Sequence, residues 1–185
     1  MSHKEIRDID DVLKIPIRRS IAHRLPWLVI GLIGGVFAAK IVEGFEAILS
    51  QNLVLAAYIP LIVYMSDAMG TQMEAFAIRD FAIHSHLHFV KYFLRQTIVV
   101  TIMGAVLSLG LFAFSMIVNG STQMAVVLGV SLYAAIITSL FTGLIVPYLF
   151  RFVKLDPANA SGPIATIIQD IVSVAVYFTV ASFLL

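Results

Sequence analysis

The chain has 185 residues, of which 60% are hydrophobic and 12% charged, and its net charge is +1. Soluble domains carry about 25% charged residues, so this composition predicts an integral membrane protein folded as a single helical bundle. The lack of cysteine excludes disulfides, thiolate metal sites and thiol catalysis. The net charge by itself says nothing about partners, and no nucleic-acid partner is expected.

The first 25 residues carry both signs of charge and precede the apolar sequence. We expect residues 1–25 to form a cytoplasmic or interfacial amphipathic segment, in which Pro16 ends or kinks a short helix. Arg18, Arg19 and Arg24 would anchor it in the headgroup layer. The apolar sequence that follows is too long for the core of a signal peptide, so we do not expect cleavage here.

Residues 26–185 are expected to form an all-α, five-helix transmembrane domain. Five segments are long and apolar enough to cross a bilayer as helices. They are residues 26–48, 53–83, 89–118, 121–150 and 156–185. The Asn119-Gly120 pair is a turn signal that separates the third segment from the fourth.

The first span carries its own packing signals. Trp27 is placed to lie at the membrane interface, and a cluster of glycines permits close contact with another helix. These glycines are Gly31, Gly34 and Gly35. Lys40 and Glu43 are three positions apart, so they can pair on one helix face.

The placement of charge predicts the orientation. Basic residues gather in the N-terminal segment and in the connections near residues 79–95 and 151–156, whereas residues 50–52 and 119–123 carry no charge. Basic connections remain in the cytoplasm, so the N-terminus is expected inside and the C-terminus outside. The expected location is the cell membrane, as a multi-pass protein.

The last span carries one carboxylate, Asp170, near its middle. A charged residue at the bilayer centre costs about 2.5–3.5 kcal/mol on insertion scales, so it normally faces a partner or a water-filled path. Polar and small residues share its helix face at helical spacing, namely Asn159, Gly162, Thr166, Ser173 and Tyr177. This stripe predicts an ion path along the helix. The alternative is that Asp170 pairs with Lys40 or is hydrogen-bonded within the bundle.

A second polar stripe lies on the second span and consists of Asp67, Thr71, Glu74 and Ile78. The carboxylates of Asp67 and Asp170 are hard oxygen ligands that suit Mg²⁺, with Mn²⁺ or Ca²⁺ as alternatives. Two copies of Asp170 facing each other across a two-fold axis would balance one divalent ion. Thr166 and backbone carbonyls near Gly162 would then hydrogen-bond the water that such an ion retains. The candidate metal residues are therefore Asp170, Asp67, Thr166 and Gly162.

Three histidines, His84, His86 and His88, follow the second span. His84 and His88 are four positions apart and could share a metal on a helix face. No cysteine or third ordered ligand is evident nearby, so an ordinary interfacial connection is the preferred interpretation.

Two segments carry a family resemblance. In residues 53–83 the relevant positions are Pro60, Met65, Gly70, Thr71, Gln72 and Arg79. In the last span they are Asp156-Pro157, the run Ala160-Ser161-Gly162-Pro163, Thr166 and Asp170. With the RLPWL sequence and Phe45-Glu46, they resemble the transmembrane domain of the MgtE-type magnesium channels and transporters, which are related to the eukaryotic solute-carrier magnesium transporters. The resemblance covers residues 24–185.

The resemblance implies a homodimer with a pore between the second and fifth helices of both subunits. It also implies that Asp170 is the main selectivity carboxylate for hydrated Mg²⁺. Ser66-Asp67-Ala68 stands where the family has Gly-Gly-Asn, so Asp67 is expected to add a second cation site or to shift ion selectivity. The family's cytoplasmic N-terminal and CBS domains have no counterpart in this sequence, which makes a separate regulatory protein a candidate partner.

The leading functional hypothesis is a channel or transporter for a divalent cation, most of all Mg²⁺, through a homodimeric pore. The alternative is a Na⁺-coupled antiporter for Mg²⁺ or another divalent cation, with Asp67 and Glu74 as coupling sites. An enzyme is not expected, because the spans contain no histidine or cysteine to build a nucleophile or a metal triad. A non-transporting subunit would leave both polar stripes without a role.

Overall fold

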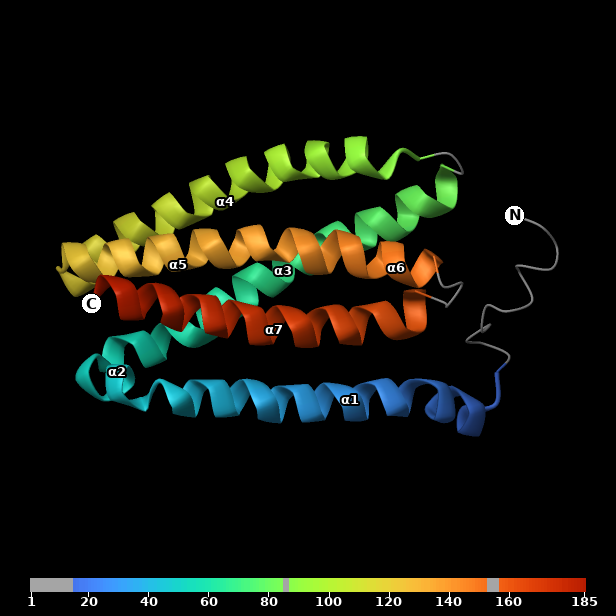
Figure 1. Cartoon of the computed structure of the whole chain (residues 1–185), viewed down its shortest axis with the longest axis horizontal. Helices are drawn as coiled ribbons and strands as arrows, with labels where there is room; N and C mark the ends of the chain where they lie inside the picture. The colour runs from blue at the N-terminus through green and yellow to red at the C-terminus, as the bar shows by residue number, and fades with distance from the viewer. Residues whose placement is uncertain (1–14, 85–86, 153–156) are drawn as a thin grey trace.

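In the computed structural model, residues 15–84, 87–152 and 157–185 are described, and the regular elements among them are all helices (Figure 1). They are α1 (Ile17–Gly44), α2 (Glu46–Gln51), α3 (Leu53–Ile83), α4 (Phe89–Asn119), α5 (Thr122–Leu140), the π-helical turn η2 (Phe141–Ile145), α6 (Val146–Phe152) and α7 (Pro157–Leu184). Within this part of the chain, 5 helices are long and apolar enough to cross a membrane. The predicted all-α architecture with five spans is thus confirmed.

The first helix begins earlier than expected. Pro16 immediately precedes α1, and the helix then runs from Ile17 through Pro26 without a break. A proline has no N–H to donate, which is no disadvantage at a helix start. Pro16 therefore precedes a long helix, and residues 17–25 are continuous with the first span. The short helix predicted before Pro16 stays a prediction. Residues 1–14 lie outside the described residues.

The turn predicted at Asn119-Gly120 is present. Gly120 has φ 65° and ends α4 in the left-handed conformation. Ser121 then caps α5, because its hydroxyl accepts a hydrogen bond from the Met124 N–H at 3.3 Å. The expected fourth span continues from α5 through η2 into α6.

The helices form a centre of three and a pair of outer helices. α3, α5 and α7 pack against one another, whereas α1 lies along α7 and α4 lies along α5 (Figure 1). α1 has no buried residue, and its outer face is apolar and exposed. A Cβ atom on Gly34 would overlap the Ile167 side chain, so a glycine there is what allows α1 and α7 to approach so closely. The predicted glycine contact is confirmed for Gly34.

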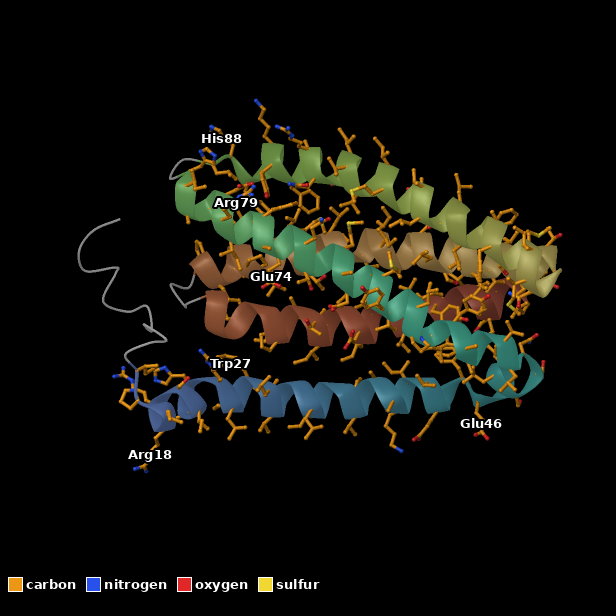
Figure 2. All side chains as sticks on the ribbon, turned by 180° about the vertical axis from the view of Figure 1, so that it is seen from behind. Arg18, Trp27, Glu46, Glu74, Arg79 and His88 are labelled. Carbon is orange, nitrogen blue, oxygen red and sulfur yellow. The ribbon has the colours of Figure 1, made fainter. Side chains whose placement is uncertain are left out.

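Two sets of connections lie at opposite ends of the bundle. The start of α1, the α3–α4 connection and the start of α7 lie at one end, and α2, the α4–α5 turn and the C-terminus lie at the other (Figure 1). Arg18, Arg79 and His88 lie at the first end, and Glu46 lies towards the second (Figure 2). The bundle therefore groups its connections as the predicted topology requires.

Candidate functional site

The two acids singled out from the sequence come together between α3 and α7. Asp67 on α3 and Asp170 on α7 are each partly exposed and lie close enough for their charges to repel one another. Thr166, one turn before Asp170, lines the same pocket as Asp67. Three of the four predicted metal residues therefore lie together. The fourth, Gly162, is partly exposed on α7 and has open space where a Cβ would lie.

A shallow pocket, continuous with the outside of the chain, lies beside these residues. Its lining comes from α3, η2 and α7 and consists of Asp67, Gly70, Thr71, Glu74, Thr142, Ala165, Thr166 and Gln169. Glu74 is buried, whereas Thr71 is exposed. Thus three polar members of the predicted stripe on α3 line one pocket, together with a threonine of α7.

The predicted stripe on α7 divides into two parts. Towards the C-terminal end its residues are buried and hold the helix in place. The Tyr177 hydroxyl donates to the carbonyl of Leu55 on α3 at 2.9 Å, and the Ser173 hydroxyl donates to the Asp170 carbonyl at 3.1 Å. Of this stripe, Thr166 lines the pocket, and Asp170 is partly exposed one turn further along α7. The side chain of Asn159 lies outside the described residues.

Lys40 does not supply the countercharge for Asp170. Its ammonium group lies 2.7 Å from the Glu43 carboxylate, and both side chains are exposed on α1. The predicted pair of Lys40 and Glu43 is therefore present. The alternative that Asp170 is neutralised by Lys40 is not supported, because Lys40 is engaged on an outer helix.

The sequence reasoning missed Gln169, which is only 1% exposed. Its amide oxygen accepts a hydrogen bond from the Thr142 hydroxyl at 2.6 Å. Its amide nitrogen donates to the carbonyl of Ala135 and to the hydroxyl of Thr138, both at 3.3 Å. A buried amide within a membrane span was the available signal, since such a group requires partners on a neighbouring helix. The residues that share a helix face with Asp170 are three or four positions away from it, so a count of that spacing does not include its direct neighbour Gln169.

The π-helical turn η2 brings α5 very close to α3 at the pocket. A Cβ atom on Gly143 would lie 2.6 Å from the carbonyl oxygen of Gly70 and 3.0 Å from the Met73 Cβ atom. Single π-helical turns insert an extra residue into a helix and occur often at functional sites. Pro147 contributes to the irregularity, since it has no N–H for the Gly143 carbonyl. The turn therefore lets two helix backbones meet beside Thr142.

Of the three histidines after the second span, His84 and His88 are described. His84 ends α3 and His88 precedes α4, and both are exposed. His86 lies outside the described residues. Over the part of the chain that is described, no three His, Cys, Asp or Glu side chains form a group that could hold a metal ion. Asp67 and Asp170 are thus a pair of acids supplemented by hydroxyl groups.

Comparison with known proteins gives one consistent result. Residues 59–180 match the MgtE family model, which is described as a divalent cation transporter. The chain is 30% identical to the magnesium transporter MgtE of Enterococcus faecalis over 95% of its own length and 39% of the relative. It is 33% identical to the MgtE of Bacillus subtilis, over 86% of this chain and 36% of that one. The MgtE of Thermus thermophilus is 29% identical over 88% of this chain and 36% of its own. The chain thus spans a little over a third of the length of these relatives.

Proposed function

Since this chain belongs to the MgtE divalent cation transporter family, we propose that it moves a divalent cation, Mg²⁺ above others, through the cell membrane. The ion path runs between α3 and α7, and Asp170 and Asp67 are its carboxylates. The proposal depends most on one observation, which is that these two acids and Thr166 lie together on adjacent spans. Two negative charges in a partly desolvated region repel each other, and a divalent cation removes that repulsion.

The ion passes while keeping part of its water. Mg²⁺ gives up water reluctantly and is usually held by one or two carboxylates with several waters retained. The Thr166 hydroxyl and a free backbone carbonyl near Gly162 provide hydrogen-bonding groups for that water. Pro163 lies inside α7 and has no N–H, which leaves the carbonyl one turn earlier without its helical partner.

A second copy of the chain completes the path. The face of α3 beside the pocket exposes Thr71 and Gln72 in the middle of a membrane span. Polar side chains are unfavourable against lipid tails, so this face needs a polar partner or water. The same face of a second copy, related by a two-fold axis, supplies both. Exposed apolar side chains on α1 and α4 contact membrane lipid.

Flux into liposomes tests the proposal. The purified chain should carry Mg²⁺, and Asp170→Ala should abolish the flux, while Asp67→Ala should reduce it. Glu46→Ala is the matched control, because Glu46 is an exposed acid away from the pocket. Unchanged flux in Asp170→Ala would overturn the proposal. Competition by Mn²⁺ and Ca²⁺ ranks the ions, and an imposed Na⁺ gradient tests for sodium coupling, which no described residue specifically favours.

A further inference from the structure

Helix α7 is held from two sides at the level of Asp170. On one side, Gln169 is hydrogen-bonded to Thr142, Thr138 and the Ala135 carbonyl of α5 and η2. On the other side, Ile167 packs where Gly34 of α1 has no side chain. Successive residues of an α-helix are separated by about 100° around its axis. The direction in which Gln169 points therefore determines the direction in which Asp170 points.

The hydrogen bonds of Gln169 resist rotation of α7 more strongly than the apolar contacts of α7 near the pocket do. Gln169 is almost fully buried, and both ends of its amide have partners. A buried amide that loses its partners costs about 1–3 kcal/mol, so rotating α7 away from α5 is opposed. The contact of Ile167 is apolar, and apolar contacts are non-directional. The hydrogen bonds of Gln169 have a defined direction, so a rotation of α7 would break them.

We infer that Gln169 is a positioning residue for the ion path, which acts by fixing the rotation of α7 and so directing Asp170 towards Asp67. Thr142 is its principal partner, since their hydrogen bond is the shortest of the set at 2.6 Å. The η2 turn is part of the same device, because it carries Thr142 and holds it against Gly70 of α3. The expected effect of Gln169 on ion transport rests on the proposed function, but the rotation of α7 can be measured without transport.

Cross-linking measures the rotation directly. The chain has no cysteine, so Asp67→Cys with Asp170→Cys introduces a single thiol pair between α3 and α7. A short bifunctional thiol reagent links the pair, and intact mass separates a link from two single adducts. Links between two copies run as dimers on a denaturing gel and are excluded. In this background we expect Gln169→Leu to slow linking within one chain severalfold.

Matched variants distinguish positioning from general destabilisation. Thr142→Val removes the donor with little change in shape, so it should slow linking less than Gln169→Leu, and the two changes together should be no slower than Gln169→Leu alone. Thr179→Val is the control, because the Thr179 hydroxyl on the same helix donates only within α7, to the Ala175 carbonyl at 2.6 Å. It should link at the parent rate.

The cross-linking and flux measurements distinguish a failure of this inference from a failure of the proposed function. If Gln169→Leu and Thr142→Val both link at the parent rate, the inference is overturned. This holds even if Gln169→Leu lowers thermal stability, because Gln169 would then have only a structural role. If Gln169→Leu does not fold, Thr142→Val decides. With the natural acids present, Gln169→Leu should raise the half-saturating Mg²⁺ concentration more than it lowers the maximal flux. If the natural chain carries no Mg²⁺, the proposed function fails, and the linking rates still decide the positioning.

Discussion

At the residue scale, Asp67 and Asp170 form an arrangement that a purely structural role does not explain. Two like charges in a partly buried region raise the energy of the folded chain unless a cation lies between them or one acid is protonated. Replacing one acid with its amide would relieve that repulsion. The proposed ion path would account for the pair, because a divalent cation between the two acids offsets their repulsion.

The residue-scale prediction concerns Asp67→Asn, which keeps the shape of the side chain and a hydrogen-bond acceptor for Thr166 while removing one charge. Two unit charges about 4 Å apart interact by about 4 kcal/mol at an effective dielectric constant of 20, before desolvation is subtracted. A divalent ion loses twice as much as a monovalent one when a charge is removed. We expect the preference for Mg²⁺ over Na⁺ to fall by about tenfold or more, which corresponds to about 1.4 kcal/mol.

Flux in proteoliposomes with mixed Mg²⁺ and Na⁺ gradients measures this preference. Glu43→Gln is a suitable comparison, because it removes an exposed acid that pairs with Lys40 on α1. An Asp67→Asn chain with unchanged preference would show that Asp67 is no part of the ion path.

At the scale of elements, the contact between α1 and α7 depends on Gly34. A methyl group there overlaps Ile167, and such overpacking costs about 1–3 kcal/mol where the neighbours cannot move. We expect Gly34→Ala to lower the thermal stability of the detergent-solubilised protein. Its neighbour Gly35 has nothing within 4 Å of an added Cβ, so Gly35→Ala should have little effect.

A second change tests whether the overlap is the cause. Combining Gly34→Ala with Ile167→Ala removes the opposing side chain, so the pair should be less destabilising than the sum of the single changes. Simple additivity would locate the effect of Gly34→Ala elsewhere in α1.

Element types could be predicted because long apolar segments are separated either by charged residues, near 79–95 and 151–156, or by short polar connections, at 50–52 and 119–123. The start of α1 was misplaced, since Pro16 and the arginines after it are equally compatible with a surface helix and with the beginning of a span. Pro147 signals an irregularity near η2, but the sequence does not show that Gly143 meets Gly70 on another helix there. Gln169 was missed for the related reason that its partners lie on α5.

At the scale of the whole molecule, the two ends of the bundle differ in charge. Arg18 and Arg79 lie at the end that carries the α3–α4 connection (Figure 2), and Lys91 is in the first turn of α4, which follows that connection. Residues 50–52 and 119–123 at the other end are uncharged. Because basic connections stay in the cytoplasm, the first end is expected inside. Ser50→Cys and His88→Cys place exposed thiols at the two ends of a chain without other cysteines. In intact cells an impermeant thiol reagent should label the Ser50 variant and not the His88 variant, and the reverse pattern would invert the topology.

The pairing of two copies is the largest-scale prediction. Thr71 is exposed on the polar face of α3, and Val106 is exposed on the apolar face of α4. A tryptophan at Thr71 would enter the proposed dimer contact, whereas a tryptophan at Val106 would only contact lipid, where a large apolar side chain is well accommodated. We expect the natural chain and Val106→Trp to be dimers by light scattering in detergent, and Thr71→Trp to dissociate and lose Mg²⁺ flux. A monomeric natural chain would place the ion path within one copy. A fully dimeric Thr71→Trp chain would place the dimer contact on another face.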